Sequence, residues 1–325
     1  MPRIGQKELA SARCLSALAV PGDVAEADTS VIEDRIQRWR STSGGGLVLF
    51  HDPCYPPLLR EIGKPPLGLF LCGDVAILHS PAVAVVGARA AAASYREWTH
   101  DTCAALARCG IVIASGMARG IDAEAHRGAL AAAGKTVAVT GSGLDLCYPP
   151  ENAALQRQIE ASGCVVSELL PGTPPRPWHF PSRNRILAGL VRAVVVVQAE
   201  LKSGALITAR LALHENRDVM AVPGDIQDPR SRGPHRLLRS GACLVETAAD
   251  ILRELGWQRD AALPGAHATD EQAILSQLWI GPLAVDALRT KLGWDASRVQ
   301  RALFELELVG LVEHDAQGRV RVASS

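Results

Sequence analysis

Residues 83–90 read VAVVGARA, and this stretch decides the fold class. Its apolar, β-branched run has no period-2 polarity, which is typical of a strand buried on both faces of a parallel sheet. Gly87 allows a sharp turn, and Arg89 then follows at the carboxyl end of the strand, where open α/β sheets bind ligands. The G-x-G-x-x-G spacing of dinucleotide-binding loops is absent, which disfavours an ordinary NAD enzyme.

The same alternation of buried strands and amphipathic helices continues down the chain. Strand, helix, strand at this spacing predicts βαβ units with right-handed crossovers. We therefore predict an α/β fold, with a doubly wound, mainly parallel sheet of Rossmann type over residues 79–256. The predicted strands are residues 83–87, 111–114, 136–140, 164–169, 193–198, 218–222 and 242–245, and the clearest helices are residues 95–109, 122–133, 152–161 and 203–215.

The two flanks of this domain have different patterns. Residues 1–78 predict a small helical (SAM-like) module followed by a Pro-rich connector, with helices at 7–19 and 30–40 and a strand-like run at 67–72. Residues 257–268 predict a linker, because Pro264 and Gly265 break any regular element. Residues 269–325 predict a winged helix, with helices at 270–279, 283–292 and 295–309 and a closing hairpin.

The net charge of zero hides differences between these parts. The 325 residues carry 34 basic and 34 acidic side chains, but the sheet domain has 19 basic and 16 acidic residues. The N-terminal part has 8 and 9, and the part from residue 257 onward has 7 and 9. Apolar runs such as residues 193–197 are far shorter than a membrane span of about 18 residues. Eight cysteines form no Cys-x-x-Cys pair. We expect a cytoplasmic protein with reduced thiols, no membrane contact and no metal site.

The loops at the predicted strand ends repeatedly combine glycine with arginine. The sequences SGMARG (115–120), SRNR (182–185), SGALIT (203–208) and VPGDIQDPRSR (222–232) each follow or border a predicted strand. Residues 169–199 and 229–245 contain eight arginines and no acidic residue. One mononucleotide does not need so many cations, whereas a nucleic-acid backbone gains affinity with each neutralised phosphate. Aromatic residues are only 4% of the chain, so we expect phosphate contacts to dominate and Phe180 alone to meet a base.

Other interpretations of these motifs stay open at this point. Asp122 and His126 share a helix face, as an acid/base pair or as a packing and capping pair. An enzyme of the nucleoside-monophosphate phosphoribohydrolase type would use Glu168 or Glu200 after a strand, but its PGG-x-GT signature is absent. A transcription regulator would use the winged helix. That domain is net acidic, with Glu305 and Glu307 near its arginines, which favours a protein-contact or structural role over duplex recognition.

Six of these motifs, in order between residues 83 and 242, resemble the DNA-processing protein A family (DprA, also called Smf). They are VVGAR, SGMARGIDAEAHRGAL, GSGLDLCYPPEN, SELLPGTPPRPWHFPSRNRILAGL, VVVVQAELKSGALITARLAL and VPGDIQDPRSRGPHRLLRSGA. The resemblance implies an extended Rossmann-like domain that binds single-stranded DNA in natural transformation, protects it, and loads the RecA recombinase onto it. It also implies a homodimer formed through that domain, without catalysis or a cofactor.

The candidate DNA-binding residues come from these motifs and from the second acid-free window. They are Gly87, Arg89, Ser115, Gly116, Arg119, Gly120, Phe180, Arg183, Asn184, Arg185, Ser203, Gly204, Thr208 and Arg232. We expect Arg183, Asn184 and Arg185 to open a helix, where the helix dipole and the guanidinium groups would both favour phosphate.

Overall fold

A computed structural model shows the arrangement of the chain and describes residues 29–257, 270–278, 282–308, 311–315 and 318–322. The chain divides into two compact units, residues 1–258 and 259–325. No helix among the described residues is long and apolar enough to cross a membrane.

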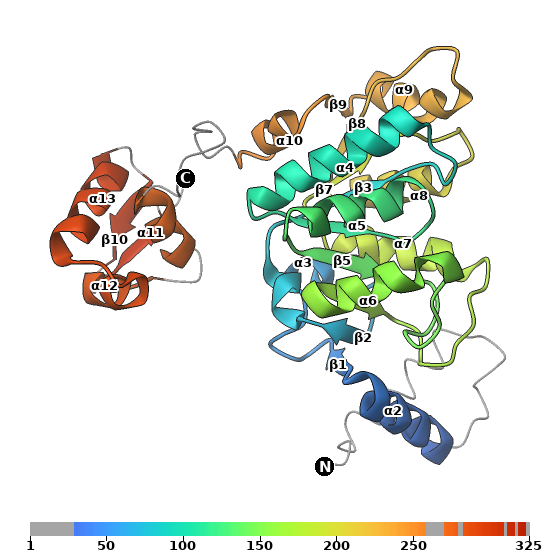
Figure 1. The fold of residues 1–325 in the computed structure, drawn as a ribbon, viewed down its shortest axis with the longest axis horizontal. Coiled ribbons are helices and arrows are strands. Elements are labelled where there is room, and N and C mark those ends of the chain that lie inside the picture. The colour runs from blue at the N-terminus through green and yellow to red at the C-terminus, as the bar shows by residue number, and fades with distance from the viewer. Residues whose placement is uncertain (1–28, 258–269, 279–281, 309–310, 316–317, 323–325) are drawn as a thin grey trace. The chain divides into compact units, whose positions relative to one another are not determined.

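The first unit contains a nine-stranded sheet in the order β1-β2-β6-β5-β4-β3-β7-β8-β9 (Figure 1). All the pairings from β6 to β9 are parallel. The parallel strands are β3 (Ala82–Val86), β4 (Val112–Ser115), β5 (Thr136–Val139), β6 (Cys164–Ser167), β7 (Ala193–Val196), β8 (Asp218–Ala221) and β9 (Cys243–Leu244). The predicted doubly wound Rossmann-type sheet is confirmed.

Helices cover both faces of this sheet. Leu106 of α4 and Ala125 of α5 pack with Val83 on one face, whereas Leu187 of α7 and Ala209 of α8 pack with Ala84 on the other. Successive residues of one strand thus enter opposite cores, which explains why the strand lacks polar alternation. The helices are α3 (Pro57–Arg60), α4 (Ala93–Arg108), α5 (Ile121–Ala131), α6 (Ala153–Ser162), α7 (His179–Gly189), α8 (Gly204–His214), α9 (Arg232–Arg239) and α10 (Ala248–Glu254).

The sheet also includes two strands from the region before residue 79. β2 (Gly68–Gly73) pairs antiparallel with both β1 (Gly46–Leu49) and β6. The run at residues 67–72 predicts β2. Strand β1 has no counterpart among the predicted elements, because it is only four residues long and directly follows the Ser/Gly-rich stretch. The helix expected at residues 30–40 is α2 (Thr29–Ser43). The helix expected at residues 7–19 lies outside the described residues.

The second unit has the predicted three helices and a hairpin. The helices are α11 (Asp270–Leu278), α12 (Val285–Leu292) and α13 (Ala296–Leu308), and the hairpin pairs β10 (Val312–His314) with β11 (Val320–Val322). The Asp295 carboxylate accepts the N–H of Arg298 at 2.9 Å, so it caps α13 as its sequence position predicts. The second helix begins at Val285 and not at residue 283 as expected, because Leu283 forms an antiparallel bridge to Val320 of the hairpin.

Candidate nucleic-acid interface

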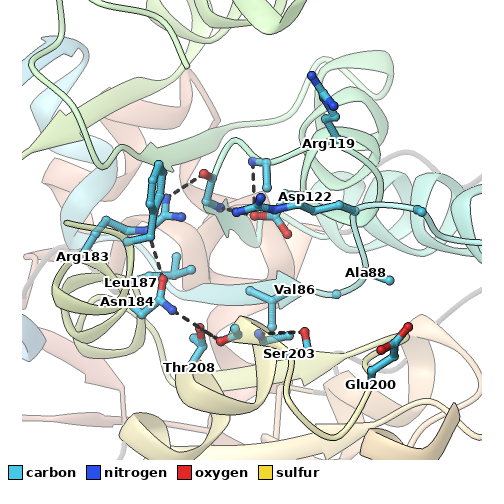
Figure 2. Close-up of a pocket in the computed structure, with 18 of the residues that line it drawn as sticks. Val86, Ala88, Arg119, Asp122, Arg183, Asn184, Leu187, Glu200, Ser203 and Thr208 are labelled. Carbon is cyan, nitrogen blue, oxygen red and sulfur yellow. Dashed lines mark hydrogen bonds between the residues drawn. The ribbon is translucent and has the colours of Figure 1, made fainter. Parts of the chain in front are cut away.

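The strand order reverses at the centre of the sheet, and a pocket of about 470 Å³ lies there. The chain winds outward from β3 through β4 and β5 to β6, and then returns to β7 on the other side of β3. Loops that diverge from neighbouring strands leave a crevice outside the carboxyl ends of those strands. Figure 2 shows this pocket between the β3 and β4 loops, α7 and the start of α8.

The β3 loop passes close to its neighbours and exposes Arg89. A Cβ on Gly87 would lie 2.7 Å from Ile121 and 3.0 Å from the carbonyl oxygen of Gln198, so only glycine fits there. The Gln198 side chain accepts the N–H of Ala92 at 2.9 Å and holds the far end of the loop. Arg89 is exposed and lines the pocket. Within the described part of the chain, its side chain forms no ion pair or hydrogen bond.

The loop after β4 is held by its own backbone and by a buried carboxylate. Asp122, 6% exposed, accepts the N–H groups of Gly116 at 3.1 Å and of Ala118 at 3.4 Å. Burial raises the pKa of Asp122, and the charge of Arg183 and these hydrogen bonds oppose that rise. Met117, at φ 61°, is in the left-handed region, and the Asn152 side chain donates to its carbonyl at 2.8 Å.

This geometry decides between the two interpretations of Asp122 and His126. Asp122 is a capping residue for the β4 loop. His126 is buried elsewhere, with Nδ1 2.7 Å from the Thr136 hydroxyl, and that hydroxyl donates to the carbonyl of Ile113 at 2.6 Å. Because the hydroxyl proton is already used, Nδ1 of His126 must donate. Burial lowers the pKa of His126 to about 3, so the ring is neutral near pH 7. The two side chains therefore form no acid/base pair.

Arg183 lies beneath the pocket and holds its walls together. It is 8% exposed and donates to the carbonyl groups of Gly116, at 2.7 Å, and Val139, and to the side chain of Asn184. Burial lowers the pKa of Arg183 to about 10, and nearby Asp122 partly offsets that effect. A guanidinium with three internal acceptors contributes positive charge to the pocket more than it contacts a ligand directly.

The expected position of Arg183 in its helix is wrong. Helix α7 begins at His179, so residues 183–185 lie in its second turn and do not open it. The sequence does not mark the true start, because the N-cap residue is Trp178, whose side chain makes no capping hydrogen bond. The positive charge remains at the site, but its origin is the buried guanidinium and not the helix N-terminus.

The N-terminus of helix α8 also lies at the pocket. Ser203 caps it by accepting the N–H of Ala205 at 3.2 Å, as its sequence predicts. A Cβ on Gly204 would meet nothing within 4 Å, so the space in front of this helix end is open. Asn184 donates to the Gly204 carbonyl at 3.4 Å, and Thr208 lies one turn into the helix (Figure 2). N-termini of this kind attract phosphate through free N–H groups and the helix dipole.

The other cationic side chains at the pocket differ in whether they form an ion pair with an acidic residue. Arg119 pairs with Glu151, and Arg230 pairs with Asp228 at 2.9 Å. Lys202 is exposed, and no ion pair or hydrogen bond of its side chain occurs among the described residues. Arg89 and Arg183 line the same pocket, and the charge of Arg89 adds a little to the lowering of the Arg183 pKa by burial. An anion that binds between them relieves this repulsion.

Ten of the fourteen predicted residues line this pocket. They are Gly87, Arg89, Gly116, Arg119, Phe180, Arg183, Asn184, Ser203, Gly204 and Thr208. Four lie outside its lining. Ser115 is buried and donates to the carbonyl of Val85 at 2.6 Å, and Gly120, at φ 71°, passes against the carbonyl oxygens of Ala88 and Arg89.

The other two outlying residues are arginines. Arg185 pairs with Glu168 and donates to the carbonyl of Lys64 at 2.9 Å, so it anchors the connector. Arg232 is exposed at the start of α9. The sequence interpretation does not include Lys202, Arg230 or Tyr148 among the site residues. Lys202 immediately precedes the motif that begins at Ser203, and this position could have identified it as a site residue.

Fold and site together define an α/β protein of Rossmann type that gathers cations and a helix N-terminus around an open crevice, as a binder of a phosphate-bearing ligand does. The chain belongs to the family of DNA recombination-mediator protein A, whose model matches residues 46–256. A second model, the DprA winged helix domain, matches residues 258–318. The predicted family and fold class are therefore confirmed.

Known relatives agree with this assignment. Protein Smf of Escherichia coli (strain K12) is 38% identical over 296 residues, covering 87% of this chain and 79% of that protein. DNA processing protein DprA of Streptococcus pneumoniae (strain ATCC BAA-255 / R6) is 46% identical over 203 residues, covering 62% and 72%.

Two solved structures share the fold. DprA from Streptococcus pneumoniae superposes with a TM-score of 0.63 at 40% identity, covering 74% of this chain and 86% of that one. DNA processing protein A from Helicobacter pylori, described with its unique single-stranded DNA binding mode, gives a TM-score of 0.59 at 29% identity, covering 65% and 95%.

Proposed function

We propose that this protein binds single-stranded DNA through the pocket at the carboxyl ends of β3, β4 and β7, without catalysing a reaction. The observation that carries the proposal is a pair of cations, Arg89 and Lys202, that have no partner among the described residues and line the same pocket as the open N-terminus of α8. These groups have no described protein partner, so phosphates would supply their counter-charges. The Helicobacter pylori relative, described as binding single-stranded DNA, supports this ligand.

The direct test is binding of a fluorescent oligonucleotide to Arg89→Glu. We expect the affinity to fall at least about tenfold, because one phosphate contact is replaced by a repulsion. Arg108→Glu makes the same charge change at the last turn of α4, which lies at the opposite end of the strands, and should bind like the parent. If both variants bind like the parent, the site is misplaced.

We further propose that the bound strand passes to the RecA recombinase in natural transformation, from a homodimer formed through the Rossmann-like domain. The family's description as DNA recombination-mediator protein A and the DNA-processing names of the relatives support a role in DNA recombination. Purified protein should increase RecA filament formation on a strand already covered by single-strand-binding protein. No increase would contradict the loading step alone and would leave DNA binding intact.

Only one of the two carboxylates that the phosphoribohydrolase alternative requires lies at the pocket. Glu168 is paired with Arg185 and does not line the pocket, whereas Glu200 lines the same pocket as Arg89 and Lys202. Incubation of the protein with nucleoside monophosphates should release no base if the protein only binds. Release that is lost in Glu200→Gln would establish the enzyme.

A further inference from the structure

Two aromatic rings meet on one wall of the pocket. Tyr148, in the loop after β5, and Phe180, in the first turn of α7, have ring centroids 5.5 Å apart and planes inclined at 44°. Both residues line the same pocket as Arg89 and Lys202. Tyr148 is 41% exposed, and its hydroxyl forms no hydrogen bond within the described part of the chain. A large aromatic surface therefore lies open beside the cations.

Both rings are positioned before any ligand arrives. The loop that carries Tyr148 is closed by two hydrogen bonds: the Ser142 hydroxyl donates to the Leu146 carbonyl at 2.7 Å, and the Leu146 N–H donates to the Gly143 carbonyl at 3.0 Å. Phe180 lies against Gly141, where a Cβ would come within 3.0 Å of its ring. A ligand that stacks here pays little entropy for ordering the side chains.

The spacing of the rings limits how a base can bind. One DNA turn of about 34 Å holds about 10 stacked base pairs, so stacked rings lie about 3.4 Å apart and a base held between two rings needs roughly 6.8 Å. The observed 5.5 Å leaves no room for one between Tyr148 and Phe180. A base can stack on the open face of Tyr148, while Phe180 supports that ring from the side.

We propose that Tyr148 is a base-stacking platform that selects unpaired nucleotides, an inference that rests on the proposed binding of single-stranded DNA. Phosphates lie against Arg89 and Lys202, and a base from the same strand turns toward Tyr148. In a duplex both faces of each base are covered by neighbours, so this contact favours single strands. The platform adds a specificity-determining residue to a site otherwise made of cations and backbone.

The test compares two fluorescent strands of equal length, one of thymidine nucleotides and one in which the sugars carry no bases. We expect Tyr148→Ala to weaken binding of the thymidine strand at least about fivefold, the effect typical of one lost stacking contact. Binding of the abasic strand should be unchanged. Tyr148→Phe should bind both strands like the parent. The matched control is Leu146→Ala, which changes an exposed side chain on the same loop that does not line the pocket.

Two results would overturn the inference while leaving the proposed function intact. Tyr148→Ala could bind the thymidine strand like the parent, or it could lose affinity for both strands equally, as a distorted loop would. Failure of the parent protein to bind either strand would overturn the proposed function and this inference with it.

Discussion

At the scale of single residues, the arginines of this site differ in what their guanidinium groups contact. Arg183 is buried against backbone carbonyls and holds the β4 loop and the end of β5 to α7. Arg185 is committed to Glu168. Arg89 has no described partner, so its charge is the one most available to a ligand. Arg183 and Arg185 therefore stabilise the structure, whereas Arg89 is the arginine expected to bind the ligand.

This division predicts the salt dependence of binding. Lys202→Ala should reduce the slope of log K against log salt concentration by about 0.7, the value for one phosphate contact on a single strand. Arg89→Ala should do the same, and the double variant should lose about twice as much. Titrations at several salt concentrations check this. An unchanged slope in all three variants would show that neither cation meets a phosphate.

The buried histidine predicts a stability that depends on pH. Burial lowers the pKa of His126 to about 3, below the value near 6.5 expected in the unfolded chain. The unfolded state therefore takes up the proton first, and stability falls as the pH drops below about 6.5. Between pH 7 and pH 5 this group should cost about 2 kcal/mol.

His126→Asn lacks this titration, and its denaturation midpoint should change less over the same pH range. Urea denaturation of both proteins at matched pH values makes the comparison, in which all other titrating groups are shared. Parallel pH profiles for the two proteins would contradict the neutral buried state.

At the scale of elements, two glycines next to the pocket have opposite surroundings. A Cβ on Gly116 would lie 2.6 Å from Arg183 Nη2 and 2.7 Å from Asp122 Oδ2, whereas a Cβ on Gly204 would meet nothing within 4 Å. The β4 loop is therefore closely packed against charged groups. The start of α8 is open to the ligand.

The matched substitutions should separate stability from binding. Gly116→Ala should lower the free energy of unfolding by about 2 kcal/mol or more, because the buried charged groups must shift. Gly204→Ala should leave stability unchanged or raise it by about 0.5–1 kcal/mol, while its methyl group reduces phosphate access. Denaturation and oligonucleotide titration check both variants. Equal stability losses would contradict the difference in packing.

Periodic elements could be predicted from the sequence, whereas contacts between distant segments could not. The expected helix at residues 203–215 is α8, because an apolar pattern and a serine cap mark it. Strand β1 is short and lies at the edge of the sheet, so its sequence contains no long apolar run that would predict it. The sequence shows that Arg183 is charged but not that two carbonyl groups surround it. Loop residues such as Arg89 are predictable because the end of a strand places them.

At the scale of the whole molecule, the second unit carries an arginine that is already engaged with other side chains. In the winged helix, Arg298 pairs with Asp270 at 2.7 Å and its guanidinium lies 4.3 Å from the centroid of the Trp294 ring. Exposed Phe304 and Glu305 share α13 with it. An engaged arginine beside acidic and apolar groups suits contact with a protein better than contact with phosphate.

Removal of the winged helix should therefore leave binding of single strands intact. A chain that ends at residue 258 retains the whole sheet and pocket, and its affinity should stay within about twofold of the parent's because no phosphate contact is lost. Titration of the truncated protein, with circular dichroism to confirm folding, checks this. A folded truncated protein that no longer binds would place part of the site in the second unit.

The central claim is that an unpaired strand binds to Arg89 and Lys202, which have no partner in the described part of the chain, and to the exposed ring of Tyr148. The most direct measurement is an anisotropy titration of the intact protein with single-stranded and duplex DNA of equal length and related sequence, repeated over a range of salt concentrations. We predict tighter binding of the single strand for any sequence, with log K falling linearly against log salt. Equal or tighter binding of the duplex, or an affinity that does not respond to salt, would contradict the account.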